Sequence, residues 1–350
     1  MKFDKQLNIA GKTISKEHPC FIIAEAGVNH GGDMNLAKTL IDIAVEAEVD
    51  AVKFQAFRTD ELIIDQVEKA PYQTKTTSET ESQADMLRKL ELQKEHYQEL
   101  KDYCTKKGII LLITPFDEKS LFELEEIGLE AYKVASTDTT NLPFLKQIAM
   151  TGKPIFLSTG MSYLEEIKMA LEEIHPHNSQ LVLMQCTANY PIADEEANLR
   201  VLNTFDRAFD VLLGYSDHSV GTGAAPYAVP MGVVLVEKHF TIDKEAEGPD
   251  HRASLDPEEL KELVKEIRRI EAYLGRSIKE PTESESQTRN SLQKCLVAKQ
   301  NINEGEEFSL NNLTAKRTGG EGISPIRYKE LIGRKAKQAF RKNQIIEWDN

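Results

Sequence analysis

The chain has 350 residues, a length that suggests two domains or one large barrel with an appendage and excludes a small disulfide-held scaffold. Hydrophobic residues make up 40% and charged residues 29%, so the chain can bury an ordinary globular core. The formal net charge of −14 argues against a general binder of nucleic acid or of anionic membranes, because such binders need a broad positive field.

Short β-branched runs alternate with amphipathic stretches over most of the chain. The predicted strands are 21–27, 51–57, 109–116, 131–136, 154–160, 181–186, 211–216 and 233–240. A helix is predicted over 257–274, with Asp256 as N-cap, Pro257 at its first position and Gly275 after its end. Eight strand–helix units over roughly 250 residues match a parallel (β/α)8 TIM barrel. The first strand is not followed by a GxGxxG or P-loop pattern, which disfavours a doubly wound nucleotide-binding sheet.

The predicted barrel domain is 1–275, and two further segments follow it. Residues 276–290 are rich in Ser, Thr and Glu without a helix or strand period, which predicts a linker. Short alternating runs in 291–350, broken by Gly, Asn and Pro, predict a small β-rich domain. That domain has 11 lysines and arginines against 7 acidic residues. A basic module can dock on an acidic face of its own chain or of a partner subunit, with chance composition as the alternative.

The cysteines and the N-terminal residues indicate a compartment. The four cysteines are scattered without a CxxC pair, and no apolar run approaches the ~18 residues that a membrane span needs. Residues 1–20 lack the apolar core of a signal peptide. We therefore expect four free thiols, no membrane association and a cytoplasmic location.

Charged residues stand at the ends of several predicted barrel strands, where barrel enzymes carry their chemistry. Glu25, Lys53, Gln55 and Lys133 all fall on inward-facing positions by the two-residue period. Burying an ammonium group is costly unless an anion or a carboxylate meets it. The two lysines therefore predict a bound phosphate or carboxylate, and the alternative is internal ion pairs with Glu25 or Asp138.

Hydroxyl and imidazole groups recur at the same strand ends. Short hydroxyl donors beside lysines suit phosphate oxygens, although serine is also common in turns. His218 and His239 follow neighbouring strands with matching parity, so they could share one divalent cation, Mn²⁺ being favoured, that acts as a Lewis acid. Each histidine could instead be a hydrogen-bonded structural residue. The hydroxyl residues are Thr114, Ser136, Ser158 and Ser216.

Read in order, these residues resemble the sialic acid synthase family, whose members condense phosphoenolpyruvate with an N-acylated hexosamine to a nine-carbon 2-keto acid. The similarity runs from about residue 20 to 350, through AEAGVNHGG, VKFQAF, TPFD, YKVAS, LSTGM, NYP, GYSDH, EKHFT and GPDHRAS. It implies a barrel followed by a SAF, or antifreeze-like, domain, in a swapped homodimer whose small domains cover the partner's active site.

The resemblance also implies roles for individual residues. Glu25 and Asp138 are candidates for proton transfer, and Mn²⁺, or else Mg²⁺ or Co²⁺, would be held by His218 and His239. Phosphoenolpyruvate would be held by Lys53, Thr114, Lys133, Ser136, Ser158 and Ser216. The amino sugar would meet Glu25, Gln55, Tyr190 and Asp250, together with Arg317 of a partner's SAF domain.

Three positions depart from the family pattern. Thr137 and Asp138 replace the usual glycine and glutamate, Ala188 stands where some relatives have a phosphate-contacting asparagine, and the turn after Arg317 reads TGGEG without the usual proline. Residues 65–83, expected to overhang the mouth of the barrel, and GPDHRAS look like the N-acetylneuraminate and legionaminate branch more than the pseudaminate branch. The amino sugar is left open between N-acetylmannosamine and 2,4-diacetamido-2,4,6-trideoxymannose.

Two rival classes of function remain. The first is another phosphoenolpyruvate-using or aldolase-type barrel, pseudaminate synthase included, in which a lysine could form a Schiff base. The second is a non-catalytic carbohydrate- or ice-binding protein. An ice binder needs a flat face with few charges, and 291–350 has 18 charged residues.

Overall fold

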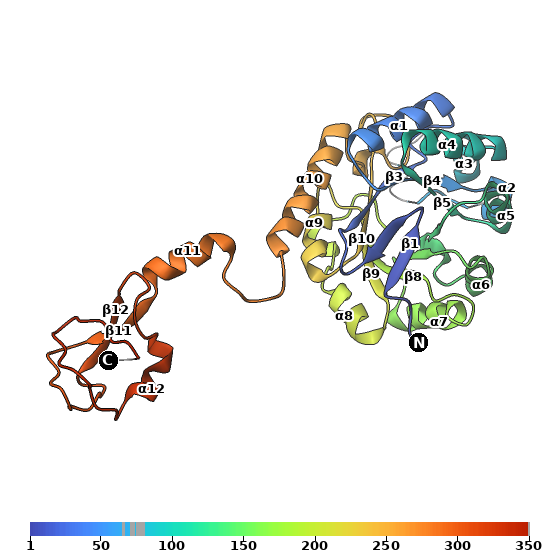
Figure 1. Ribbon diagram of the computed structural model, residues 1–350. Coiled ribbons are helices and arrows are strands. Elements are labelled where there is room, and N and C mark those ends of the chain that lie inside the picture. Colours follow the sequence, from blue (N-terminus) through green and yellow to red (C-terminus); the bar gives the residue numbers. More distant parts are fainter. Residues whose placement is uncertain (65–66, 71–73, 75–80, 349–350) are drawn as a thin grey trace. The chain divides into compact units, whose positions relative to one another are not determined.

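The computed structural model describes residues 1–64, 67–70, 74 and 81–348, and the chain divides into two compact units, Met1–Gly275 and Arg276–Asn350. In the first unit, eight parallel strands close into a barrel in the order β10-β3-β4-β5-β6-β7-β8-β9 (Figure 1). This confirms the predicted (β/α)8 barrel. The strands are β3 (Phe21–Gly27), β4 (Ala51–Ala56), β5 (Ile110–Pro115), β6 (Tyr132–Val134), β7 (Ile155–Ser158), β8 (Leu181–Cys186), β9 (Leu212–Asp217) and β10 (Leu235–His239).

Helices surround the barrel and bury their apolar faces against the outward-facing residues of the strands. The long helix α10 has Asp256 as N-cap and Gly275 at its end, as predicted. Among the described residues, no helix combines the length and apolar character that a membrane crossing requires. The helices of this unit are α1 (Met34–Glu46), α2 (Thr59–Leu62), α3 (Gln83–Leu90), α4 (Lys94–Lys107), α5 (Glu118–Ile127), α6 (Leu142–Met150), α7 (Leu164–Ile174), α8 (Val201–Ala208), α9 (Ala225–Ala228) and α10 (Pro257–Leu274).

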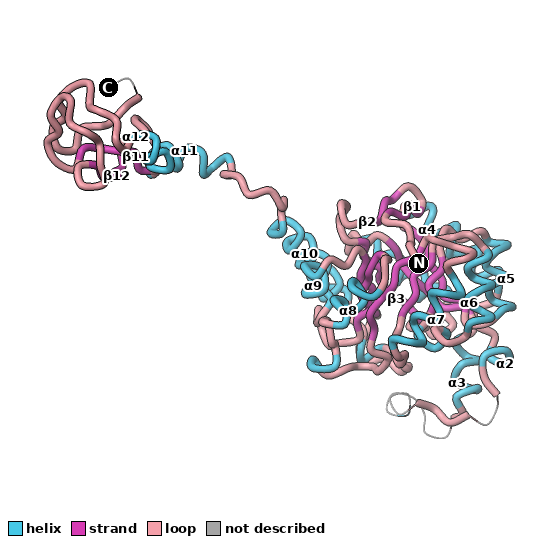
Figure 2. The backbone as a smooth tube through the Cα atoms, turned by 90° about the horizontal axis from the view of Figure 1, so that it is seen from below, coloured by secondary structure: helices cyan, strands magenta, loops and turns pink. Residues whose placement is uncertain are grey.

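A hairpin that the sequence analysis did not predict closes the N-terminal end of the barrel. It consists of β1 (Gln6–Ile9) and β2 (Lys12–Ser15), which pair antiparallel (Figure 2). Leu7, Ile9 and Ile14 are buried against the inward-facing side chains at the start of the barrel strands, such as Phe21 and Ile23. The hairpin therefore leaves the opposite end of the barrel, where the strands finish, for chemistry.

The barrel interior changes from apolar to polar along its axis. Near the hairpin the strands point Phe21, Ile23, Leu112 and Phe156 inward. Two residues further along each strand, the inward positions are occupied by charged and hydroxyl side chains that are also buried. Side chains alternate along a strand, so the next inward position lies two residues further on. The inward side chains therefore change from apolar to polar at the same height on every strand, and the polar ones form a single layer.

The second unit contains a helix where a linker was predicted. Residues 276–290 were expected to have no regular structure, but α11 (Glu283–Leu292) begins there with Thr282 as its N-cap and Glu285 completing a capping box. The helix buries none of its own residues. Its capping signal was present in the sequence, but its lack of apolar residues gave no helical period to detect.

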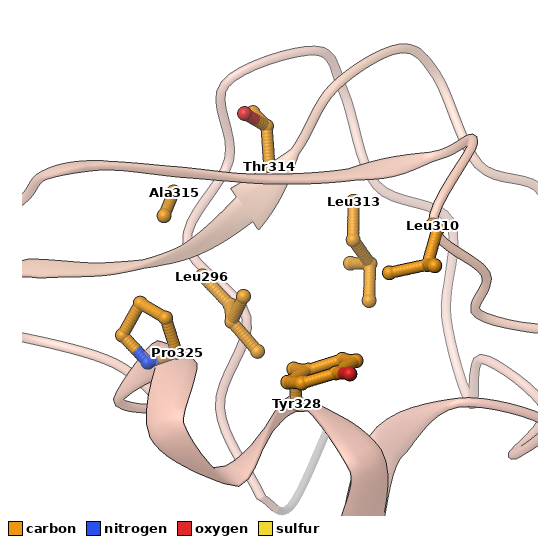
Figure 3. Close-up of a pocket in the computed structure, with 7 residues that line it drawn as sticks. All are labelled: Leu296, Leu310, Leu313, Thr314, Ala315, Pro325 and Tyr328. Carbon is orange, nitrogen blue, oxygen red and sulfur yellow. The ribbon is translucent and has the colours of Figure 1, made fainter.

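The rest of the second unit is built around a two-stranded sheet. Strands β11 (Lys294–Ala298) and β12 (Leu313–Arg317) pair antiparallel, and other predicted runs contribute only single bridges, such as Ile302 with Phe340. Helix α12 (Tyr328–Leu331) packs nearby. Leucine side chains and the ring of Tyr328 line a small pocket between β12 and the chain around α12 (Figure 3).

Candidate active site

The polar layer of the barrel interior contains the strand residues that the sequence predicted. All eight strands contribute, because each places an inward-facing polar side chain close to its carboxyl end. These residues are Glu25 of β3, Lys53 and Gln55 of β4, Thr114 of β5, Lys133 of β6, Ser158 of β7, Cys186 of β8, Ser216 of β9, and Glu237 and His239 of β10.

Lys53 pairs with the carboxylate on the neighbouring strand. Its Nζ lies 2.6 Å from Oε2 of Glu25 and donates a hydrogen bond to Oγ1 of Thr114 at 3.0 Å. Glu25 and Lys53 are register partners on β3 and β4, so the same inward alternation on both strands brings them together. One of the two alternatives drawn from the sequence, an internal ion pair with Glu25, is therefore present.

Lys133 pairs with a carboxylate that the sequence analysis left out of the site. Its Nζ lies 3.3 Å from Oε1 of Glu237, and that oxygen also accepts a hydrogen bond from Oγ of Ser216 at 3.0 Å. Oε2 of Glu237 lies 3.7 Å from Nζ of Lys53, so one carboxylate serves both lysines. The sequence could have identified Glu237 as a site residue, because it lies two residues before His239 and therefore on the same face of the strand.

Asp138 is positioned by its own loop. It lies in a short 3-10 turn, Ser136–Asp138, where it accepts hydrogen bonds from Nδ2 of Asn141 at 3.1 Å and from Oγ1 of Thr137 at 3.3 Å. Burial raises the pKa of this carboxyl group, and the two donors only partly oppose the shift. Asp138 therefore has local partners of its own in this structure.

The two lysines differ in how well their charge is compensated. Burial favours the neutral amine of Lys53, but Glu237 and Glu25 outweigh burial and raise the pKa of Lys53. At Lys133 burial prevails over the attraction of Glu237, and the pKa of Lys133 is lowered. An anion bound beside Lys133 would supply the counter-charge that this ammonium group lacks.

Hydroxyl groups surround the lysines, and one of them is unused. Oγ of Ser158 is buried and has no hydrogen-bond partner among the described residues. Oγ of Ser136 accepts a hydrogen bond from the backbone N–H of Gly160 at 2.9 Å. A Cβ at Gly160 would lie 2.9 Å from that oxygen and from Cβ of Ala188, so the glycine allows three loops to converge here. A buried donor without a partner is costly, which indicates that a ligand or water oxygen meets Ser158.

The two histidines lie side by side at the carboxyl ends of β9 and β10. The ring centroids of His218 and His239 are 5.4 Å apart, and the ring of Tyr190 lies 4.0 Å from His218 and 5.5 Å, edge-on, from His239. Nδ1 of His218 donates to the carbonyl oxygen of Thr187 at 2.8 Å, since a carbonyl can only accept. That bond leaves Nε2 as the nitrogen of His218 that is available to another partner. Burial opposes the charged ring, but Cys186 outweighs burial and raises the pKa of His218.

These two imidazoles fit a divalent cation with open coordination positions. Nδ1 of His239 is buried without a hydrogen-bond partner in the described part of the chain, and burial lowers the pKa of His239 well below its usual value, which keeps the ring neutral. Neutral imidazoles are the form that binds metals. Among the residues described, no cluster of three or more His, Cys, Asp or Glu suited to a metal occurs.

Cys186 also belongs to this layer, although the sequence analysis gave it no role beyond a free thiol. All four cysteines are free, as expected. The Sγ atom of Cys186 lies 3.8 Å from Nδ1 of His218 at the end of β8. The sequence could have indicated a role for Cys186, because it is the last residue of a predicted barrel strand. The analysis passed over it because the cysteines do not have the spacing of a metal-binding motif.

Gln55, Tyr190 and Asp250 lie on the histidine side of the site. Nε2 of Gln55 donates to Oε1 of Glu25 at 3.1 Å. A Cβ at Gly27, which has a φ of 54°, would lie 3.3 Å from both of those atoms and 3.4 Å from Cε1 of His239. Asp250 is buried, and burial, with a smaller contribution from Glu25, raises the pKa of Asp250 to about 6.

Arg317 belongs to the second unit, where it ends β12 and is exposed. The turn that follows Arg317 lacks proline, but a side-chain hydrogen bond and glycines in the left-handed region define its conformation. Oγ1 of Thr318 donates to the carbonyl oxygen of Glu321 at 2.5 Å, and three glycines between 319 and 322 adopt positive φ. The predicted role of Arg317 at a partner's site stays a prediction, and most of the segment 65–83 lies outside the described residues.

A barrel whose strand ends gather lysines, carboxylates and histidines in one buried layer has the arrangement of an enzyme of this fold class. The NeuB family model matches residues 40–279 and the SAF domain model matches 293–350. The chain therefore belongs to the NeuB family, and it is an enzyme.

The chain is similar to synthases of several nine-carbon sugar acids. The N,N'-diacetyllegionaminic acid synthases of Campylobacter jejuni and Legionella pneumophila are 45% and 38% identical to this chain, over 93% and 95% of it and 98% and 94% of their own lengths. The pseudaminic acid synthase of Campylobacter jejuni is 31% identical over 91% of this chain and 92% of its own. A crystal structure of N-acetylneuraminic acid synthetase from Leptospira borgpetersenii, in complex with citrate, has a TM-score of 0.74 at 35% identity and covers 83% of this chain and 98% of that one.

Proposed function

We propose that this chain condenses phosphoenolpyruvate with an N-acylated hexosamine, releasing phosphate and forming a nine-carbon 2-keto acid. The observation that carries the proposal is the pair of buried lysines, Lys53 and Lys133, that share Glu237 beside the two histidines. A small anion with two charged ends suits such a layer, because one end can meet the ammonium groups while the other faces the hydroxyl donors.

The lysines would bind the anionic reactant rather than act as bases. Lys133 lacks a full counter-charge and gains one when a phosphate or carboxylate arrives, which keeps it protonated. Oγ of Ser158 is available to donate to an anionic oxygen. The set that would contact phosphoenolpyruvate is Lys53, Thr114, Lys133, Ser136, Ser158 and Ser216.

The bond changes of the reaction are as follows. The methylene carbon of phosphoenolpyruvate forms a C–C bond to the aldehyde carbon of the open-chain sugar, whose oxygen takes a proton. The positive charge left at the enol carbon is met by water, which loses a proton. The resulting tetrahedral centre breaks its C–O bond to phosphate and loses its hydroxyl proton, giving the ketone.

Glu25 is the carboxyl group best placed for the proton transfers. It contacts Lys53 on one oxygen and Gln55 on the other, and burial raises its pKa against the pull of Lys53, which favours its taking up a proton. Asp138 is the second candidate, since burial also raises its pKa. A divalent cation, Mn²⁺ in the first place, would supply a Lewis acid for the aldehyde oxygen when bound by His218 and His239. Gln55, Tyr190 and Asp250 would orient the sugar.

For the amino sugar we propose 2,4-diacetamido-2,4,6-trideoxymannose. Two relatives that make N,N'-diacetyllegionaminic acid, from different bacteria, are more similar to this chain than the pseudaminic acid synthase is. Campylobacter jejuni has both kinds of synthase: its N,N'-diacetyllegionaminic acid synthase is 45% identical to this chain and its pseudaminic acid synthase 31% identical. Because both come from one organism, the difference in identity reflects the product of the enzyme rather than its source.

The experiment that tests reaction and substrate together is phosphate release from phosphoenolpyruvate with each candidate sugar. We expect release only when a sugar is present, with kcat/KM highest for 2,4-diacetamido-2,4,6-trideoxymannose. Higher kcat/KM with N-acetylmannosamine would overturn the substrate and keep the reaction. No release with any N-acylated hexosamine would overturn the reaction itself.

We also propose a homodimer in which the SAF domain of each chain covers the site of its partner. The second unit is basic whereas the remainder of the chain is acidic, so the two carry complementary charge. Arg317 is exposed at the end of β12 and free to contact a sugar bound elsewhere. The cytoplasmic location stays a prediction from the sequence.

A further inference from the structure

A second pair of charged residues lies directly behind the two histidines. Asp217 precedes His218 and Lys238 precedes His239, so alternation turns these two side chains away from the barrel interior and into the layer between strands and helices. Both are 1% exposed, and Nζ of Lys238 lies 2.9 Å from Oδ2 of Asp217. The mechanism proposed above uses neither residue.

This pair organises the loop that follows β9. Oδ1 of Asp217 accepts hydrogen bonds from N and Oγ of Ser219 at 2.9 and 2.6 Å, and Oδ2 accepts from the backbone N–H groups of Ala224 and Ala225 at 3.1 and 3.0 Å. Lys238 adds a bond of 2.7 Å to the carbonyl oxygen of Ser219. Lys238 thereby contacts both residues that flank His218, through the carboxylate of Asp217 and the carbonyl oxygen of Ser219.

The loop passes so close to the pair that it requires a glycine. Gly223 has a φ of 57°, and a Cβ there would lie 2.0 Å from Oγ of Ser219, 3.0 Å from Oδ2 of Asp217 and 3.1 Å from Nζ of Lys238. No side chain fits in that space. Among the described residues, no buried polar side-chain atom of Asp217, Ser219 or Lys238 is left without a hydrogen-bond partner.

The pair also lies at a particular point of the sheet. The register between β9 and β10 ends with Lys238 opposite Asp217, and His218 and His239 are the next residues on each strand. The two ring centroids, 5.4 Å apart, thus lie just past the last paired residues. The ion pair adds a side-chain link between the two strands at their last paired position.

Stability alone does not account for such a pair. Buried ion pairs can often be replaced by apolar residues of similar volume without loss of stability, and fixing a register is their best-attested use. We propose that Asp217 and Lys238 are positioning residues, which set the spacing and orientation of His218 and His239 so that both imidazoles can bind one divalent cation. This inference rests on the metal site of the proposed function.

The test compares Mn²⁺ and inorganic phosphate binding, each by isothermal titration calorimetry, in the full-length protein. Lys238→Met and the double variant Asp217→Asn/Lys238→Met remove the ion pair at nearly constant volume. We expect each to bind Mn²⁺ about tenfold or more weakly than wild type, as disrupted support of metal ligands commonly does. Phosphate affinity should stay within about twofold, because the lysine end of the site is intact.

Two controls separate positioning from general damage. Lys153 lies just before β7, at the opposite end of the barrel from the histidines, and pairs with Glu125. Lys153→Met therefore breaks another lysine–carboxylate pair and should leave both affinities unchanged. The double variant leaves no buried charge unpaired, so it carries the test if Lys238→Met does not fold. Wild-type Mn²⁺ affinity in the double variant, or equal losses of Mn²⁺ and phosphate affinity, would overturn the positioning role.

The same titrations distinguish failure of the metal site from failure of the positioning role. If wild type and His218→Ala bind Mn²⁺ equally, or neither binds it, the metal site is wrong and the positioning role is overturned with it. If His218→Ala loses Mn²⁺ binding while the double variant keeps it, only the positioning role is overturned.

Discussion

Nζ of Lys53 lies 2.6 Å from Oε2 of Glu25, on adjacent strands and fully inside the barrel. Glu237 lies near both Lys53 and Lys133, so the two lysines share two carboxylates. Lys53 is thus paired before any ligand arrives, which offsets the cost of burying it, whereas Lys133 lacks a full counter-charge. An anionic reactant must compete with these carboxylates for the ammonium groups.

Replacing either lysine should act mainly on phosphoenolpyruvate binding. Lys53→Met or Lys133→Met removes a charged donor to the reactant, and we expect the KM for phosphoenolpyruvate to rise by roughly 100-fold or more. Initial rates of phosphate release over a range of phosphoenolpyruvate concentrations measure this. Lys153→Met serves as the matched control at the other end of the barrel. An unchanged KM in both site variants would contradict the assignment.

Lys53→Met should also destabilise the fold, because Glu25 and Glu237 would lose a buried counter-charge. Breaking one side of a buried pair typically costs about 3–5 kcal/mol. The double variant Lys53→Met/Glu25→Gln removes both charges of the closest pair and should recover much of that loss. Urea unfolding at neutral pH measures the difference, and equal stability of the single and double variants would show that the pair is not energetically coupled.

The carboxyl group of Asp250 should make stability depend on pH. Its pKa is raised from 3.8 to about 6 by burial, so the folded chain binds this proton more tightly than the unfolded chain. The resulting stabilisation is complete below the unfolded value and is lost as pH rises through about 6, by about 3 kcal/mol in all. Asp250→Asn should lack this decline. Unfolding free energies of both proteins at pH 4 and pH 7 provide the comparison, and parallel changes would argue against a buried, titrating Asp250.

Metal dependence should follow the histidine pair. Exhaustive chelation should abolish phosphate release by wild type and Mn²⁺ should restore it, whereas His218→Ala should stay inactive with or without Mn²⁺. Activity assays before and after chelation measure this, with Mg²⁺ and Co²⁺ as comparison cations. Full activity of the wild-type protein after chelation would contradict the proposed metal site.

Mixing two inactive variants tests the shared site. Arg317→Ala has an intact barrel and Lys133→Met an intact SAF domain, so mixed dimers would contain one complete site. Subunit exchange at equal concentrations should restore up to roughly a quarter of wild-type activity if each site combines two chains. The absence of any recovery, with exchange verified by native mass spectrometry, would exclude a contribution of Arg317 across subunits.

A lysine imine is the distinguishing feature of the rival aldolase mechanism. The lowered pKa of Lys133 would suit a Schiff base, but its pairing with Glu237 favours an ammonium group. We expect borohydride treatment in the presence of substrates to leave the protein mass unchanged. A mass increase that Lys133→Met abolishes would establish the rival mechanism.

Local pattern was sufficient for the barrel and for most site residues. The two-residue period assigned Glu25, Lys53 and Lys133 to the interior, and all three are buried there in contact with one another or with Glu237. The period works because strand geometry determines which face a side chain occupies, whatever its neighbours are. Within the predicted linker 276–290, residues from 283 onward form α11, which the sequence did not reveal because the helix has no buried face and only an apolar face produces a detectable helical period.

The sequence by itself determined the fold, the inward or outward face of each strand residue, and the family. Tertiary structure alone decided which charges meet: Lys133 pairs with Glu237 rather than Asp138, and Asp217 with Lys238. The physical reason is that pairing depends on register between strands and on closure of the barrel, which join residues about 20 to 200 positions apart, whereas the face of a residue depends only on its own strand.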